Sequence, residues 1–185
     1  MFIEENKRTL TQEMAKEAGF DHFGYTTIEN LEFLPDVRGM CADNRCGKYG
    51  TNWACPPACG TLEEIAERVK AYDYAMILQS TEQMEDDYDW DAIQKAGKRC
   101  GESLRKLNKQ LQNLGVKTLP MGAGGCSKCE KCTYPDAPCR FPDDLIHSME
   151  AYGLFVTGEC RKAGMKYTYG PQTMTINATI LVKEN

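Results

Sequence analysis

The chain has 185 residues, of which 42% are hydrophobic and 26% charged, and its formal net charge is −5. These proportions are ordinary for a globular protein, and the length suits a single domain, 1–185, with a core of its own. No basic stripe with interleaved aromatic residues predicts nucleic-acid binding, and no run of about 18 apolar residues predicts a membrane span. The first residues lack the basic and apolar regions of a signal peptide, so we expect a cytoplasmic location.

The first half of the chain alternates short helices and strands around a cysteine-rich segment. In chain order we expect a helix over 8–18, a strand over 22–27, an irregular segment over 28–40, a cysteine-rich loop over 41–60, a helix over 61–71 and a strand over 74–78. Gly19 stands where a glycine commonly ends a helix. Thr61 and Glu64 form a capping box, which predicts a helix start.

The second half repeats this alternation around a second cysteine-rich segment. We expect a surface loop over 81–89, a helix over 90–113, a strand over 116–120, a cysteine-rich loop over 122–140, helices over 142–152 and 156–163, and strands over 165–169 and 173–183. Pro142 suits the first turn of a helix. The order predicts an α/β (α+β) fold, with a single mixed sheet flanked by helices and two cysteine-rich metal-binding loops.

Ten cysteines are the unusual feature of the composition. A disulfide framework is a poor explanation, because no export signal is present and cytosolic thiols are kept reduced. Eight of the ten fall into two tight groups, and clustered thiols in a reduced compartment are typical of metal ligands. The first group is Cys41, Cys46, Cys55 and Cys59, and the second group is Cys126, Cys129, Cys132 and Cys139.

The second group has the spacing C-x2-C-x2-C-x6-C. Its first three cysteines match the start of the bacterial ferredoxin pattern, in which successive thiols hold one [4Fe-4S] cluster. The tail departs from that pattern, because Cys139 comes later than the fourth ferredoxin cysteine. Whether Cys139 would bind the same cluster as the other three or a second cluster is left undecided by the spacing. Zinc is the alternative, although zinc sites usually use two separated C-x2-C pairs. The glycines that precede Cys126 permit tight turns and could direct N–H groups toward a cluster, or could form only a flexible turn.

The first group has the spacing C-x4-C-x8-C-x3-C, which matches no generic template. Its clustering favours a second metal site, and the alternative is that some of these thiols are ordinary buried side chains. Cys100 and Cys160 lie alone in expected helices and are interpreted as small buried hydrophobic residues. His147 follows the second group and could either reach a metal or pack against the fold.

Two strings carry a resemblance to a known family. They are Cys-Gly-Lys-Tyr-Gly-x3-Ala-Cys-Pro-Pro over 46–57, and Cys-x2-Cys-x2-Cys-Thr-Tyr-Pro-x2-Pro-Cys-Arg-x-Pro over 126–142, followed by Ser-Met-Glu-Ala-Tyr-Gly-Leu over 148–154. Together they resemble the bacterial and archaeal predicted metal-binding family called domain of unknown function 2284. The resemblance implies a cytoplasmic metalloprotein with cysteine ligands, commonly from anaerobes. It also implies that a small or polar residue often replaces Cys59, which would leave three thiolates and an iron with an open position.

Three functions are compatible with these residues. The first is electron transfer to a redox partner through two [4Fe-4S] clusters, with nearby cations that offset the cluster charge. The second is an iron–sulfur enzyme with an open iron, which would act on a small molecule by sulfur transfer, dehydration or reductive activation. The third is a structural or metal-carrier protein that binds zinc. The cations are Lys48, Lys128, Lys131 and Arg140, and the side chains that could line a substrate pocket are Tyr49, Trp53, Tyr134 and His147.

Overall fold

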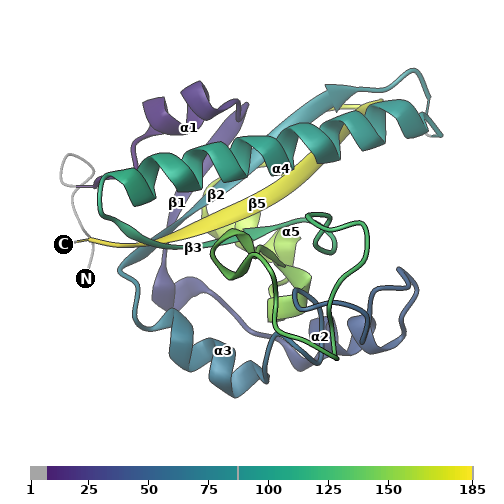
Figure 1. Cartoon of the computed structure of the whole chain (residues 1–185). Coiled ribbons are helices and arrows are strands. Elements are labelled where there is room, and N and C mark those ends of the chain that lie inside the picture. Colours follow the sequence, from purple (N-terminus) through teal and green to yellow (C-terminus); the bar gives the residue numbers. More distant parts are fainter. Residues whose placement is uncertain (1–7, 87, 185) are drawn as a thin grey trace.

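A five-stranded sheet with the order β1-β2-β5-β3-β4 lies at the centre of the molecule (Figure 1). The computed structural model describes residues 8–86 and 88–184. The strands are β1 (His22–Thr27), β2 (Tyr74–Gln83), β3 (Lys117–Gly122), β4 (His147–Ser148) and β5 (Thr173–Lys183). Strands β3 and β4 are parallel, whereas the other neighbours are antiparallel. The expected α+β fold with a single mixed sheet is therefore confirmed.

Helices cover both faces of this sheet (Figure 1). They are α1 (Gln12–Ala18), α2 (Pro35–Ala42), α3 (Leu62–Val69), α4 (Trp90–Asn113) and α5 (Val156–Lys162), with 3-10 turns η2 (Ile28–Asn30), η3 (Pro142–Asp144) and η4 (Glu150–Tyr152). Helices α1 and α4 pack on one face, and α3 and α5 pack on the other. No helix in the described part of the chain is long and apolar enough to cross a membrane.

Strand β2 is apolar on both sides because both of its faces are covered. Met76 and Leu78 point into the core beneath α1 and α4, whereas Ala75 and Ile77 point into the core on the α3 side. All four side chains are fully buried. Side chains alternate between the two faces of a strand, so a strand covered on both faces becomes a continuous apolar run.

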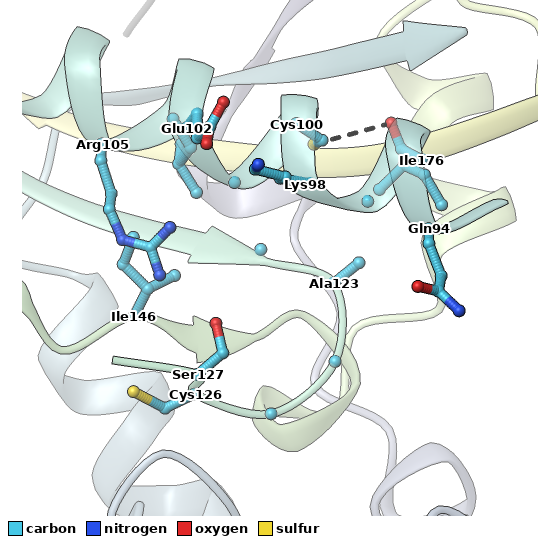
Figure 2. Close-up of a pocket in the computed structure, with 16 residues that line it drawn as sticks. Gln94, Lys98, Cys100, Glu102, Arg105, Ala123, Cys126, Ser127, Ile146 and Ile176 are labelled. Atoms are coloured by element: carbon cyan, nitrogen blue, oxygen red, sulfur yellow. Dashed lines mark hydrogen bonds between the residues drawn. The ribbon is translucent and has the colours of Figure 1, made fainter. Parts of the chain in front are cut away.

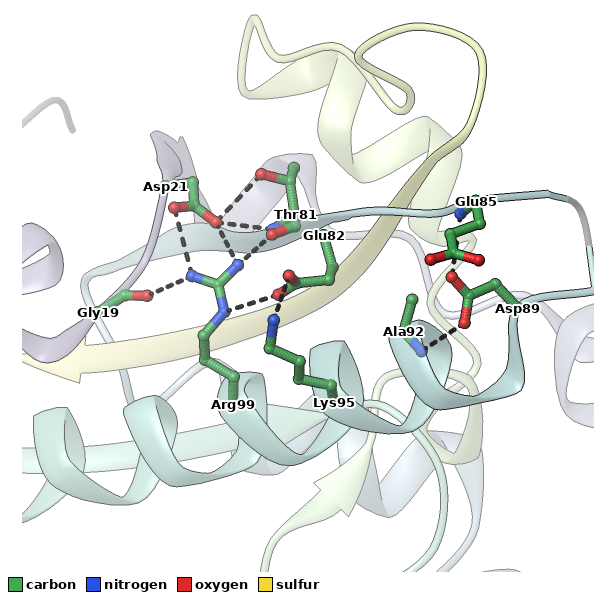
Figure 3. A network of polar contacts seen from close by, with 9 residues as sticks. All are labelled: Gly19, Asp21, Thr81, Glu82, Glu85, Asp89, Ala92, Lys95 and Arg99. Carbon is green, nitrogen blue, oxygen red and sulfur yellow. Dashed lines mark hydrogen bonds and ion pairs between the residues drawn. The ribbon is translucent and has the colours of Figure 1, made fainter.

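A polar network fixes α4 to the sheet (Figure 3). Arg99 donates from one guanidinium nitrogen to Asp21 Oδ2 at 2.8 Å, and it also donates to the carbonyl oxygens of Gly19 and Thr81. The carboxylate of Asp21 accepts a further bond from the Thr81 N–H at 2.7 Å. Partial burial alone would raise the pKa of Asp21, but these hydrogen bonds outweigh it and the pKa is lowered.

Several expected elements agree with the structure. Strand β1, helix α4 and strand β5 have the predicted limits. Thr61 and Glu64 form the capping box at the start of α3, and Gly19 ends α1 in the left-handed region with φ 112°. These elements have local signals, namely periodicity and caps, that are sufficient to place them.

The helix expected over 142–152 is wrong. The segment instead contains η3, the short strand β4 and η4. His147 and Ser148 pair in parallel with Met121 and Gly122 of β3. This pairing joins residues far apart in the sequence, and no local signal reveals it.

Four other boundaries are corrected by the structure. The helix expected over 8–18 begins only at Gln12, because Thr11 caps it. The segment 28–40 is not irregular, since it contains η2 and most of α2. The surface loop expected over 81–89 begins only after Gln83, because β2 stays paired with β5 up to that residue. Residues 165–169 form no strand. The side chain of Gln79 holds this segment instead, because its Nε2 donates to the Lys166 carbonyl oxygen and its Oε1 accepts from the Tyr169 hydroxyl.

Candidate metal centre

The two cysteine-rich segments lie against each other. The indole Nε1 of Trp53 donates to the carbonyl oxygen of Ala137 at 3.1 Å, and the Trp53 ring meets the Tyr134 ring edge-on, with centroids 5.0 Å apart. A Cβ placed on Gly125 would lie 3.5 Å from Cys55 Sγ. The backbone next to Cys126 therefore lies close to the first group.

Three thiols of the first group line one cavity of about 310 Å³: Cys41 at the end of α2, Cys46 and Cys55. Its other walls are largely apolar, with two cations and one acidic side chain, and they include Val37, Met40, Arg45, Lys48 and Glu150. Burial raises the pKa of the Cys41 and Cys55 thiols, and each is raised further by the Cys46 thiol nearby. Because a metal binds thiolates, loading this site would release protons.

Cys59 does not line this cavity. Its side chain is 3% exposed and belongs to the apolar core on the α3 side of the sheet. The thiol donates weakly to the carbonyl oxygen of Ala151 at 3.6 Å, and burial raises its pKa. The Cys59 N–H bonds to the Cys55 carbonyl oxygen at 3.3 Å, so one tight turn places the two thiols in different surroundings.

All four cysteines of the second group line a common small cavity of about 20 Å³. Each of the four is partly exposed. Two cations are held nearby: Lys128 pairs with Asp144 at 2.7 Å, and Arg140 donates to the Lys131 carbonyl oxygen at 3.0 Å. The spacing in the sequence therefore corresponds to a shared location in space.

In the described residues, the grouped thiols line cavities and do not converge on the position of a single metal ion. Within 8–86 and 88–184, no three side chains of His, Cys, Asp or Glu converge closely enough to hold a single metal ion. A structural zinc ion would need four ligands, with sulfurs about 2.3 Å from the metal. Thiolate-rich sets suit soft metals and iron–sulfur clusters, but this arrangement does not by itself identify the metal.

His147 packs against the first cysteine segment. Its Nδ1 lies 3.1 Å from the carbonyl oxygen of Ala54, and its ring centroid lies 5.0 Å from that of Tyr152. Burial lowers the pKa of His147. Of the two alternatives for this residue, the structure shows packing, in a position that supports the backbone next to Cys55.

Cys100 and Cys160 are buried in helices, as expected. Cys100 is 2% exposed in α4 and Cys160 is fully buried in α5. Burial raises the pKa of both thiols to about 11. A thiol with so high a pKa stays protonated at neutral pH, so neither is prepared to act as a nucleophile.

Arg38 is a site residue that the sequence analysis missed. It donates to the carbonyl oxygens of Gly60, at 2.7 Å, and of Ala151. Its charge opposes the effect of burial on the pKa of Cys41 and of Cys59. The available signal was the i, i+3 spacing of Arg38 and Cys41, which places both on one helical face once 35–42 is known to be a helix.

The fold and the grouped thiols define a class: a small α+β protein with two groups of cysteines, most of which line cavities outside the sheet. A family model described as predicted metal-binding protein (DUF2284) matches residues 26–182, so the chain belongs to that family. The match includes both cysteine groups, and it confirms the family expected from the sequence. No curated protein and no solved structure matches the chain.

Proposed function

We propose that this protein holds two [4Fe-4S] clusters, one at each cysteine group, and transfers single electrons in the cytoplasm. The observation that carries the proposal is that seven of the eight grouped thiols line two cavities, three around one and four around the other. Thiolates are the usual protein ligands of such clusters, and the second group has the ferredoxin-like spacing.

The closeness of the two groups supports electron transfer. Gly125 lines the cavity of the first group, and the next residue, Cys126, lines that of the second. Electron transfer slows steeply with distance, so neighbouring clusters would exchange electrons readily. Lys48 lines the first cavity, and Lys128 and Arg140 line the second. These cations would offset the negative charge of thiolate-bound clusters and guide an acidic redox partner.

A second function is favoured by the position of Cys59. With only three thiols around the first cavity, a [4Fe-4S] cluster held there would have one iron without a protein thiolate. Such an open iron would bind a small-molecule substrate and supply Lewis-acid or redox chemistry to it. Around it, Lys48 and Arg45 would attract an anionic substrate, while the buried Val37 would contribute an apolar wall.

Metal and acid-labile sulfide analysis of anaerobically purified protein tests the proposal. We expect brown protein with about eight irons and eight sulfides per chain, and an EPR signal after reduction by dithionite. A signal that changed on adding small molecules would favour the open-iron enzyme. Colourless protein with zinc and no sulfide would refute both iron–sulfur functions and leave the structural or carrier role.

Substitution of single cysteines tests the ligand assignment. We expect Cys129→Ser to lose the iron of the second group, because it removes one of four thiols around that cavity. Cys100→Ser is the matched control, since this thiol is buried in α4 and belongs to neither group. Equal iron content in the two variants, measured on folded protein, would show that the assignment is wrong.

A further inference from the structure

A third cavity, of about 570 Å³, lies between α4 and the glycine-rich loop that follows β3 (Figure 2). It is larger than either cysteine-lined cavity and falls within the size range of small-molecule sites. The electron-transfer proposal does not use it. Its walls combine apolar, glycine and cationic residues, and each kind has a distinct consequence for what could bind.

The apolar part of the cavity is formed by Leu104, Ile146 and Ile176. Beside it, Gly97 and Gly101 stand one turn apart on α4 and expose bare helix backbone. A Cβ on Gly97 would meet nothing within 4 Å. Glycine in a helix interior costs about 1 kcal/mol relative to alanine, so packing does not explain its presence there. The space that it leaves open belongs to the cavity.

Two cations line the cavity, and Arg105 also lies close enough to Asp144 for its charge to help lower the pKa of that carboxyl group, after the larger effect of Lys128. Arg105 extends from α4 toward Ser127 (Figure 2), and Lys98 lies two turns earlier on the same helix. In the part of the chain that the structure describes, neither side chain forms a salt bridge. The Arg105 Nε is shielded from solvent and has no hydrogen-bond partner among residues 8–86 and 88–184. A shielded, unpaired donor is costly, and a bound anion would satisfy it.

The loop opposite α4 offers further donors. Among the described residues, none of the backbone N–H groups of 123–127 donates to a backbone acceptor. Gly124 has φ 72°, a conformation that favours glycine and lets the loop turn tightly. Glu102 is the one acidic side chain among the described residues that line the cavity, so cationic groups outnumber acidic ones there.

We propose that this cavity binds a small organic anion, namely a phosphate monoester or a carboxylate with an apolar portion. The anionic group would lie between Arg105, Lys98 and the loop, and the apolar portion would lie over Leu104 and the bare backbone at Gly97. Cys126 borders both this cavity and that of the second cysteine group. A ligand bound here would therefore be adjacent to the metal centre, although its binding does not depend on which metal is present.

The test is isothermal titration calorimetry of the anaerobically purified protein, with its metal bound. The probe is 8-anilinonaphthalene-1-sulfonate, which combines an anionic group with an apolar body. We expect one site per chain. Arg105→Gln should weaken binding by about tenfold or more, because it removes a charge-assisted contact. Lys109→Gln, on the same helix but outside the cavity, is the control and should bind normally.

Gly97→Leu provides a second, independent variant. The Cβ of leucine would meet nothing within 4 Å, the rest of the side chain would extend into the cavity, and leucine is a better helix former than glycine, so the melting temperature should rise while probe binding is lost. Loss of binding in a more stable protein cannot come from unfolding. No detectable binding at millimolar probe, or binding that survives both Gly97→Leu and Arg105→Gln, would overturn the proposal.

Competition identifies the anionic group. Phenyl phosphate and benzoate carry the same ring with a phosphate or a carboxylate, so preferential displacement by one of them shows which kind of natural ligand the cavity takes. Failure of both to displace the probe would contradict an anion site at Arg105.

Discussion

At the scale of single residues, the position of Cys59 separates the two iron–sulfur functions. Spacing in the sequence places Cys59 with its group, but the structure buries its thiol in the core beside Ala151. Cys55, four residues earlier, lines the cavity with Cys41 and Cys46. Spacing could therefore predict which cysteines belong together, but not which way each thiol faces, because that depends on long-range packing.

Paired substitutions at these two positions decide the number of ligands in the first group. We expect Cys55→Ser to lose the iron of this group, whereas Cys59→Ala keeps it and lowers the free energy of unfolding by about 1–2 kcal/mol through lost core packing. Iron analysis and denaturant unfolding of both variants measure these effects. If Cys59→Ala lost as much iron as Cys55→Ser, the first cluster would have four protein thiolates and the open-iron enzyme would be excluded.

At the scale of elements, the helices and strands with strong local signals were predictable. Helix α4 has a cap at Asp89 and an apolar face of residues such as Leu104, Leu107 and Leu111, and its limits were predicted correctly. Strand β4 could not be predicted, because two residues carry no periodicity and their pairing partners lie in β3. How α4 docks on the sheet was also hidden, since Arg99 reaches residues far away in the sequence.

The docking of α4 predicts a pH-dependent stability. Because the folded-state pKa of Asp21 lies below its ordinary value of 3.8, its contribution is present above that value and is lost as the pH falls through the lowered one. We expect Asp21→Asn and Arg99→Gln each to lower the free energy of unfolding by about 1–2 kcal/mol at pH 7. The difference in the free energy of unfolding between Asp21→Asn and wild type should vanish in strong acid.

Urea unfolding at several pH values measures this effect. Lys95→Gln is the control, because Lys95 pairs with Glu82 at 2.6 Å but is 69% exposed, and such pairs contribute little. If the free energies of unfolding of Asp21→Asn and wild type differed by the same amount from pH 7 to pH 2, the carboxylate charge would not be what holds α4 in place.

At the scale of the whole molecule, the core and the candidate metal centre are built from different parts of the chain. The core on the α4 side contains none of the eight grouped cysteines, and the core on the α3 side contains Cys59 alone. Residues 43–60 and 123–141 contain no helix or strand. A chain of this size buries enough apolar surface to fold without metal, unlike a zinc finger.

Metal removal should therefore loosen the cysteine-rich segments and leave the sheet intact. We expect the metal-free protein to keep its far-UV circular dichroism and the slow amide exchange of β2, β5 and α4, while exchange speeds up in 43–60 and 123–141. Hydrogen exchange followed by mass spectrometry on metal-loaded and metal-free protein measures this directly. Uniform fast exchange after metal removal would mean instead that metal binding and folding are one event, and that the thiols hold the whole fold together.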